Sequence, residues 1–308
     1  MTELPEVGSR VSLRYRLPAD PDRPMTDVVG HIVDSDSATV VRIRTRHGDV
    51  VEVDIEDVLA VRVVPEMPVR TGQIRNLEHA AALAWPGTEQ EWLDGWLLRH
   101  GRGVTRRANS AVPLRFSSFS EITAVAQWYA ERGQPAVVSA PDRLIRLPDG
   151  VVTDAENLVM TTDVEGSGRS EVSVAAAPDA AWLQLYQRDV PVDVLTATVG
   201  GEVGFGTLAG AAVGRVAVTE APDGTRWAGI SAVHVSEGSR RQGLARRLCL
   251  GLLDWAHAHR ATRAYVQVVE DNSAARALYD AMGFRVHHRS RYVRAEDLLG
   301  ARGQPGRT

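Results

Sequence analysis

The chain of 308 residues contains no lysine, so arginine supplies all 35 of its basic side chains. It therefore has no side-chain amine of its own. Cysteine is almost as scarce, because Cys249 is the only one. A single cysteine excludes an internal disulfide framework and a cysteine-based zinc site. No other cluster of metal-ligating residue types stands out, so we expect no bound metal ion.

Long hydrophobic runs are also missing. No apolar run approaches the roughly 20 residues that a membrane-spanning helix needs. The first residues, Met-Thr-Glu-Leu-Pro-Glu, have neither the basic nor the apolar region of a secretory signal. We therefore expect a cytoplasmic protein without membrane contact. The net charge is −4, and residues 1–65 account for it with twelve acidic residues against eight arginines. A nucleic-acid-binding protein is generally basic, so no nucleic acid is expected as a partner.

The length predicts two or three domains, because it exceeds what one hydrophobic core usually organises. Residues 6–64 consist of short apolar runs separated by turn residues, a pattern typical of β-strands. Four or five short strands in about sixty residues are too few for a sandwich. They predict a small SH3-like β-barrel over residues 1–66.

Helical and strand patterns alternate over residues 72–182, which predicts an α/β unit without a cofactor motif. Its expected helices are 76–84 and 120–132, the second ended by Gly133, and its expected strands are 92–98, 110–114, 135–139 and 158–162. Three arginines lie close together at positions 102, 106 and 107. They either form a solvated edge or line a cleft between this unit and the next.

Residues 183–298 are predicted to form a second α/β unit, followed by a disordered tail over residues 299–308. We expect strands at 203–208, 212–219, 227–235 and 264–269, helices at 243–259 and 273–282, and a last strand from Phe284 onward. The neighbours His287 and His288 lie on this last strand, where adjacent side chains point to opposite faces.

A first chemical motif follows the strand that ends in Val233-His234-Val235. A tight loop, Ser236 to Ser239, leads into Arg240-Arg-Gln-Gly-Leu-Ala245 at the start of a helix. Such a helix start directs free backbone N–H groups and the positive end of the helix dipole outward, which suits a pyrophosphate. The small residues at positions 243 and 245 permit close approach, and the arginines add positive charge. Taken alone, the pattern also fits a plain strand–helix junction.

A second motif runs from Asn272 to Phe284, Asn-Ser-Ala-Ala-Arg-Ala-Leu-Tyr-Asp-Ala-Met-Gly-Phe. Asn272 is a good helix N-cap, and Gly283 suits the left-handed position after a helix. Asn272 and Tyr279 share one helix face, about 10 Å apart along the axis. They could contact an extended ligand at two points, or simply cap the helix and pack.

In order and spacing, the two motifs together resemble the GNAT superfamily of N-acetyltransferases. There, an Arg/Gln-x-x-Gly-x-Gly/Ala loop binds the pyrophosphate of coenzyme A, and an Asn-x-x-Ala-x-x-Leu-Tyr-x-x-x-Gly-Phe segment lines its pantetheine arm. The resemblance covers residues 200–292 and implies a mixed sheet flanked by helices. It also suggests that the 72–182 unit is a degenerate copy of the same fold, as in tandem GNAT proteins.

The resemblance implies acetyl-CoA as the cosubstrate and assigns the residues that would bind it. Val233 and Val235 would offer backbone groups where two strands splay, and Tyr279 would protonate the departing thiolate as general acid. The full set implied for binding is Val233, His234, Val235, Arg240, Arg241, Gln242, Gly243, Leu244, Ala245, Arg246, Asn272, Ala275 and Tyr279.

The general base stays open. Many members of the family carry a glutamate on the strand before the loop, but residues 228–232 contain no carboxylate. His234, Glu237 and Glu270 are alternatives, as is an amine that binds already neutral. The expected reaction is acetyl transfer to a primary amine of a small molecule or of a basic protein or peptide. Two other interpretations remain: a non-catalytic acyl-CoA sensor, and a partner-binding adaptor based on the N-terminal barrel.

Overall fold

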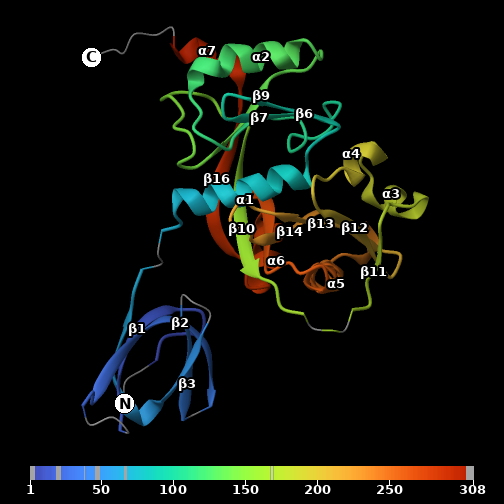
Figure 1. Ribbon diagram of the computed structural model, residues 1–308. Helices are drawn as coiled ribbons and strands as arrows, with labels where there is room; N and C mark the ends of the chain where they lie inside the picture. The colour runs from blue at the N-terminus through green and yellow to red at the C-terminus, as the bar shows by residue number, and fades with distance from the viewer. Residues whose placement is uncertain are drawn as a thin grey trace. The chain divides into compact units, whose positions relative to one another are not determined.

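The computed structural model describes residues 4–18, 22–37, 39–45, 49–65, 68–166, 168 and 170–302. The chain divides into two compact units, with the division between Pro68 and Val69 (Figure 1). Each unit has a sheet and a hydrophobic core of its own.

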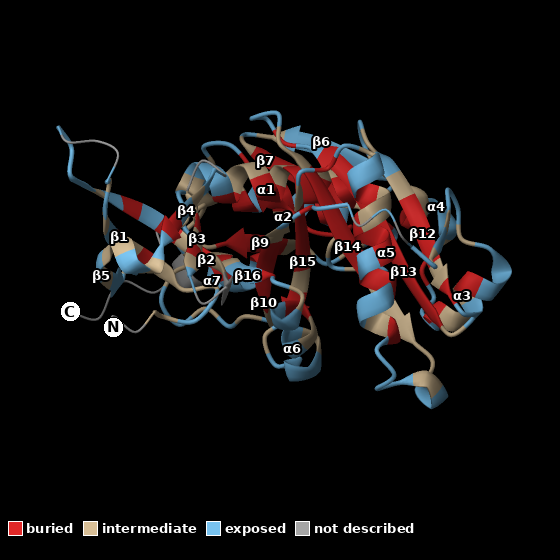
Figure 2. Cartoon of the chain, turned by 90° about the horizontal axis from the view of Figure 1, so that it is seen from below, coloured by how far each residue is buried: buried red, intermediate tan, exposed pale blue. Residues whose placement is uncertain are grey.

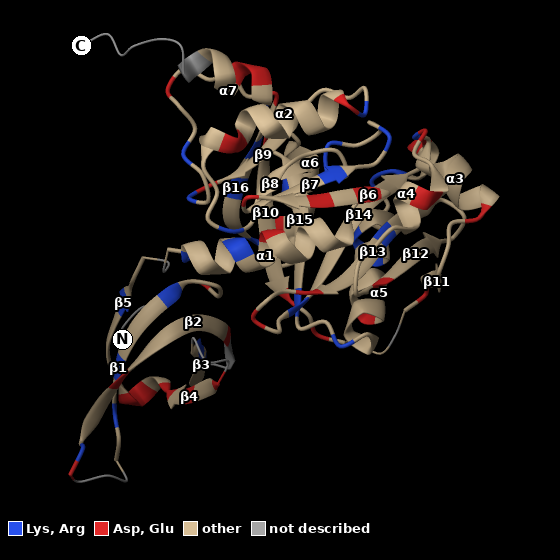
Figure 3. Cartoon of the chain, turned by 45° about the horizontal axis from the view of Figure 1, so that its top comes forward, with Lys and Arg blue, Asp and Glu red and all other residues tan. Residues whose placement is uncertain are grey.

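The first unit is a single antiparallel sheet in the order β4-β3-β2-β1-β5. Alternate side chains such as Leu13, Ile32 and Ile43 are fully buried and form its core. Acidic side chains follow one another along β4 and the turn after it (Figure 3). The small β domain expected from the sequence is confirmed. Its elements are β1 (Arg10–Arg16), β2 (Met25–Ser37), β3 (Val40–Thr45), β4 (Val50–Asp54), η1 (Ile55–Asp57) and β5 (Val58–Val63).

The second unit is built on one sheet of eight strands in the order β11-β12-β13-β14-β15-β10-β16-β9. A smaller sheet, β6-β7-β8, lies in the same unit. The strands are β6 (Glu89–Leu93), β7 (Trp96–His100), β8 (Val112–Pro113), β9 (Val137–Pro141), β10 (Ala155–Asp163), β11 (Ser173–Ala175), β12 (Glu202–Leu208), β13 (Ala212–Glu220), β14 (Arg226–Val235), β15 (Arg263–Val269) and β16 (Arg285–Arg294). The helices are α1 (Thr71–Ala84), η2 (Phe119–Glu121), α2 (Ile122–Ala130), α3 (Ala180–Tyr186), α4 (Val192–Thr196), η3 (Glu237–Ser239), α5 (Leu244–Ala258), α6 (Ser273–Ala281) and α7 (Ala295–Arg302).

Helices cover the central strands of this sheet on both faces (Figure 1). On one face, α1 packs Leu77 against Trp227 of β14 and Tyr265 of β15. On the other, α5 and α6 pack against Ala228 and Ile230 of the same strand β14. Because successive strand residues point to opposite faces, β14 contributes to two separate cores. In Figure 2 the buried residues of this sheet run most continuously along β13 and through the first half of β14.

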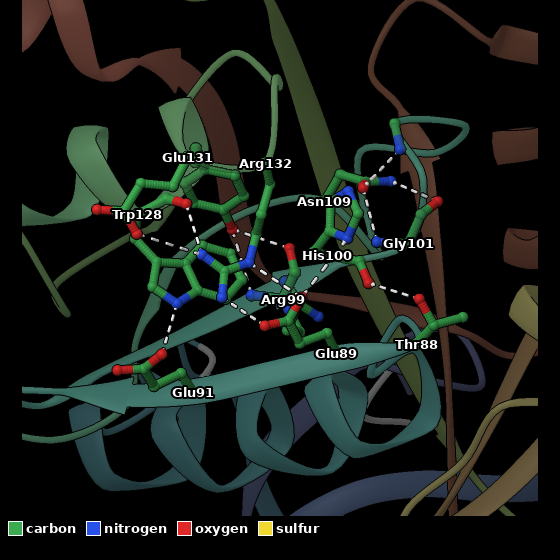
Figure 4. Close-up of polar contacts among 12 residues, drawn as sticks. Thr88, Glu89, Glu91, Arg99, His100, Gly101, Asn109, Trp128, Glu131 and Arg132 are labelled. Atoms are coloured by element: carbon green, nitrogen blue, oxygen red, sulfur yellow. Dashed lines mark hydrogen bonds and ion pairs between the residues drawn. The ribbon is translucent and has the colours of Figure 1, made fainter.

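One expected strand, residues 92–98, is instead a hairpin. β6 and β7 pair antiparallel around Asp94 and Gly95, whose φ angles are 41° and 90°. Positive φ at both central residues is the requirement of a tight hairpin turn, and Asp-Gly meets it with little strain. The guanidinium of Arg132 lies 3.6 Å from the centre of the Trp128 ring and pairs with Glu89 on β6 (Figure 4). The Asp-Gly pair was the signal for this turn.

The large sheet crosses the boundary that the sequence placed between residues 182 and 183. β10 comes from the first expected α/β unit, yet it pairs with β15 on one side and β16 on the other. Helix α7 takes in residues 299–302, which we had expected in a disordered tail. Residues 303–308 lie outside the described residues.

Every helix in the described part of the chain is too short or too polar to span a membrane.

The core under α5 provides a direct test of the fold. Leu252 is fully buried, whereas Leu250 on the same helix is 37% exposed. We expect Leu252→Ala to lower the free energy of unfolding by about 2–5 kcal/mol because it leaves a cavity, and Leu250→Ala to change it by about 0.5 kcal/mol or less. Tryptophan fluorescence during urea unfolding measures both, since all seven tryptophans lie in the second unit. Equal losses in the two variants would contradict this packing.

Candidate active site

The parallel strands β14 and β15 part halfway along their length. Ladder pairs join them only from Trp227–Arg263 to Ile230–Val266. Both strands are described in full and continue beyond this point without pairing to each other. The facing edges after Ile230 and Val266 therefore present backbone N–H and C=O groups to an opening in the sheet.

A bulge in β14 accompanies this parting. Ala232 and Val233 together oppose the single residue Gly214 of β13, and Ala232 has a φ of 54°. A left-handed conformation costs a non-glycine residue roughly 1–2 kcal/mol, and a bulge bends its strand. β14 thus turns away from β15 at the point where the pairing between them ends.

The loop after β14 leads into the N-terminus of α5. Arg241 and Gly243 both adopt left-handed conformations, with φ values of 60° and 75°. Gly243 is the N-cap of α5 and has no side chain with which to cap the helix. The first backbone N–H groups of a helix have no partner within it. Together with the helix dipole, they make this loop suited to an anion.

The polar side chains around this loop are mostly exposed. Arg240 Nε donates to the Val235 carbonyl at 3.4 Å, and the Gln242 amide donates to the Gly238 carbonyl at 3.3 Å. Arg247 is engaged in an ion pair with Glu171. The rest of the expected set divides by burial: Arg241 and Arg246 are exposed, Ala245 is half-buried, and Leu244 is buried in the first turn of α5.

The strand residues of the first motif face two ways. Val233 and Val235 pack against the core under α5, so only their backbone faces the opening. His234 pairs with Val213 of β13 and therefore shares its face, the one that carries the end of α1. The Nε2 atom of His234 is buried and has no hydrogen-bond partner among the described residues.

The second motif builds α6 as its residues predict. The Asn272 side chain caps the helix by accepting a hydrogen bond from the Ala275 N–H at 3.0 Å. Gly283, just after the helix, has a φ of 85°. The ring of Tyr279 is 7% exposed and packs edge-on against Phe284, with 5.4 Å between ring centres.

The side chain of Tyr279 lies in the same buried core as Cys249 of α5. Burial and the neighbouring Cys249 raise the pKa of Tyr279 well above its usual value. Burial also raises the pKa of the Cys249 thiol, to about 12. Both groups therefore stay protonated at neutral pH. A protonated phenol is what a proton donor requires.

The three bases considered from the sequence lie in different surroundings. The side chain of Glu237 is 88% exposed, beyond the end of β14. Glu270 forms an ion pair with Arg289 at 3.0 Å. His234 lies on the face toward the end of α1, as described above.

A small, partly open pocket lies on the α1 face of the sheet and reaches the point where β14 and β15 part. It is lined by Glu78, Ala81, Ala82, Trp85, Arg99, Arg107, Ser139, Gly229, Ile230, Ser231, Tyr265, Gln267 and Tyr292. Arg107 donates to the side chain and the carbonyl of Gln267, at 2.7 and 3.0 Å. The sequence left open whether the arginines at 102, 106 and 107 form a solvated edge or line a cleft. Arg107 lines this pocket, whereas Arg102 is exposed and pairs with Asp193.

Glu78 is the pocket residue that the sequence reasoning missed. It is 3% exposed, and its Oε1 atom lies 2.8 Å from Nε2 of His288. The signal was its position: Glu78 follows Leu77 and stands four residues after Ile74, on the apolar face of its helix. A carboxylate in such a position is buried only with a partner.

The two histidines of β16 correct a second expectation. His287 and His288 do not point to opposite faces, because their Nδ1 atoms lie 2.8 Å apart. The register shows the reason. Val159 and Met160 of β10 pair with His288 and Val286, which leaves His287 as an extra, bulged residue. Among the described residues, no group of three or more histidine, cysteine or acidic side chains is arranged to hold a metal ion.

Comparisons with known proteins agree with this arrangement. A family model described as "Rv0428c N-terminal Sm-like domain" matches residues 5–62, and one described as "Probable histone acetyltransferase Rv0428c C-terminal" matches residues 71–293. The chain is 44% identical over 301 residues to the probable histone acetyltransferase Rv0428c of Mycobacterium tuberculosis, covering 97% of this chain and 98% of the relative.

Two more distant proteins are also similar to this chain. The uncharacterized N-acetyltransferase YobR of Bacillus subtilis is 24% identical over 243 residues, covering 68% of this chain and 94% of the relative. A GCN5-related N-acetyltransferase from Kribbella flavida superimposes with a TM-score of 0.53 at 13% identity, over 73% of this chain and 96% of its own, and so supports the fold. Because the second family model spans most of the chain and one relative matches nearly all of it, the chain belongs to the GNAT family of N-acetyltransferases.

Proposed function

We propose that this acetyltransferase moves an acetyl group from acetyl-CoA to a primary amine by direct attack. The observation that carries the proposal is the parting of β14 from β15 next to the loop before α5. An opening in a sheet beside an anion-binding helix start suits a long ligand with a diphosphate in its middle.

The diphosphate of the coenzyme fits the loop at 240–246. Backbone N–H groups at the start of α5 would donate to its oxygens, and the left-handed residues Arg241 and Gly243 turn the chain so that these groups converge. The exposed guanidinium groups of Arg240, Arg241 and Arg246 would add charge-assisted hydrogen bonds. Gln242, Leu244 and Ala245 complete the loop.

The pantetheine arm fits the opening between the strands. Backbone groups of Val233, His234 and Val235 on β14 would pair with its amides, as an added strand does. The N–H near Val235 would stabilise negative charge on the carbonyl oxygen during attack. Asn272 and Ala275 would line the arm from the start of α6. When bound, acetyl-CoA supplies an acyl group activated as a thioester.

Tyr279 is the proposed general acid. Its pKa keeps the hydroxyl protonated, and α6 places it on the same face of the sheet as α5. It would give its proton to the departing thiolate, since a thiol with an ordinary pKa of about 8.5 is largely protonated at neutral pH.

The acceptor is proposed to be a primary amine of a basic protein. The Mycobacterium tuberculosis relative carries the name histone acetyltransferase, and histones are basic. The acidic balance of residues 1–65 would attract such a partner. A small-molecule amine is the alternative acceptor. Turnover on a panel of basic peptides and small amines distinguishes the two kinds of acceptor.

Gly243 tests the coenzyme site. Gly243→Ala puts a side chain at a position with a left-handed conformation, which costs about 1–2 kcal/mol. The loop of the free variant therefore relaxes to another conformation, and coenzyme binding must restore the left-handed one. We expect coenzyme A to bind roughly tenfold more weakly, measured by titration calorimetry. Gly224→Ala is the matched control, because Gly224 has a φ of 81° in the turn before β14, at the strand's other end. Equal affinities of the two variants would show that the loop does not bind the coenzyme.

Tyr279 tests the chemistry. The wild-type protein is mixed with acetyl-CoA and a panel of basic peptides and small amines, and the release of free thiol is followed. We expect Tyr279→Phe to lower kcat by about 100-fold with little change in acetyl-CoA affinity, because only proton transfer is lost. Tyr186→Phe, in a buried tyrosine of α3, should keep wild-type turnover. A Tyr279→Phe variant as fast as the wild type would remove the acid role, and a wild type inactive on every amine would refute the proposed reaction.

A further inference from the structure

The pocket on the α1 face contains the carboxylate that β14 lacks. Gly229 and Ser231 of β14 line this pocket, and the residue between them, Ile230, is the last to pair with β15. Glu78 of α1 lines the same pocket. The Oγ atom of Ser231 is buried there without a hydrogen-bond partner among the described residues. A buried polar atom left unpaired beside a pocket indicates that a ligand or water completes its hydrogen bonding.

Glu78 is the first member of a chain of hydrogen-bonded side chains. Its Oε1 atom lies 2.8 Å from Nε2 of His288, and Nδ1 of His288 lies 2.8 Å from Nδ1 of His287. The first two side chains are buried, at 4% and 1% exposure, whereas His287 is only partly buried. The chain therefore leads from the pocket toward the surface.

The bulge in β16 makes this chain possible. In a regular strand, His287 and His288 would point to opposite faces of the sheet. With His287 as the extra residue opposite Val159 and Met160, both rings lie on one side and meet through their Nδ1 atoms. The ring of His287 is further held edge-on to Trp227, with 6.4 Å between centres.

We propose that Glu78 is the general base, which takes the proton of the acceptor amine, and that His288 and His287 pass this proton to solvent. The inference rests on the proposed acetyl transfer. As the amine nitrogen forms its bond to the acyl carbon, the carbon–sulfur bond breaks and the sulfur takes the proton of Tyr279. The extra proton on nitrogen moves to Glu78. Glu78 then protonates Nε2 of His288, Nδ1–H of His288 protonates Nδ1 of His287, and the Nε2 proton of His287 goes to solvent. Tyr279 is reprotonated from solvent.

The charges around Glu78 suit this role. The groups that face it are Arg99 from β7, Arg107, Tyr265 from β15, and Tyr292 and His288 from β16. Arg99 is buried without a carboxylate partner among the described residues and donates to the Ser110 and Trp85 carbonyls instead. The guanidinium groups of Arg99 and Arg107 repel a protonated amine and favour its neutral, nucleophilic form. Burial raises the pKa of Tyr265 and Tyr292, so both remain neutral.

His287 is suited to the outer end of the relay. Burial, the neighbouring His288 and Arg263 lower the pKa of His287 to about 3. The ring is therefore neutral at working pH, with one nitrogen that accepts and one that donates. A neutral imidazole can take a proton from His288 on one side and release one on the other.

Glu78→Gln separates the catalytic role from a structural one. The glutamine amide can still hydrogen-bond to Nε2 of His288, through its oxygen or its NH2 group, so a purely structural contact survives. The variant cannot act as a general base, because an amide does not bind a proton at working pH. We expect kcat to fall by about 100-fold or more, the acidic limb of the pH–rate profile to move to higher pH, and acetyl-CoA affinity to stay unchanged. Glu202→Gln, which removes an ion pair with Arg226 at the start of β12, is the control for losing a carboxylate.

His287→Gln tests the relay and should slow turnover less than Glu78→Gln. A second readout needs no turnover: ring ¹⁵N shifts of the free protein should show His287 neutral from pH 5 to pH 8 and should change at His288 in Glu78→Gln. Wild-type kcat and pH profile in Glu78→Gln, beside an active wild type, would overturn the base. A wild type inactive on all amines would refute the acetyl transfer itself. The hydrogen-bonded chain would then be tested by the ring signals alone: His288 signals that do not respond to Glu78→Gln would overturn it.

Discussion

The structure depends on one constraint, which is that β14 and β15 must stop pairing after Ile230 and Val266. The bulge at Ala232 bends β14 at that point. The parting exposes backbone groups between two faces of one sheet: α5 and α6 carry the coenzyme-type motifs on one face, and α1 carries Glu78 on the other. A thioester held in the opening would be reached from both faces, which places the proposed acid and the proposed base on opposite sides of the reacting carbon.

The sequence predicted most of the second α/β part, because its signals are local. The strand at 226–235, the loop with Gly243, and the N-cap at Asn272 each follow from spacing, turn residues and capping within one short segment. The two motifs lie within about 45 residues of each other, so their relative order could also be recognised as that of a GNAT protein. The small β domain was predicted by the same kind of local alternation.

The remaining features depend on contacts between distant segments. Glu78 and His288 are 210 residues apart, and nothing near either residue reveals that they meet. The bulge that brings His287 and His288 together arises from the register in which β16 pairs with β10. That register cannot be predicted from the residues around the two histidines. β10 itself lies between β15 and β16, across the boundary expected between the two α/β parts. Two features had a local signal that was missed: the Asp94-Gly95 pair of the hairpin, and Glu78 on the apolar face of α1.

The central claim is that the opening between β14 and β15 holds the thioester carrier. A crystal structure of the protein with coenzyme A tests it most directly. The account predicts the diphosphate against the backbone N–H groups at the start of α5, and the pantetheine arm between the strands beyond Ile230 and Val266. A coenzyme bound elsewhere on the second unit, with this opening left empty, would contradict the account.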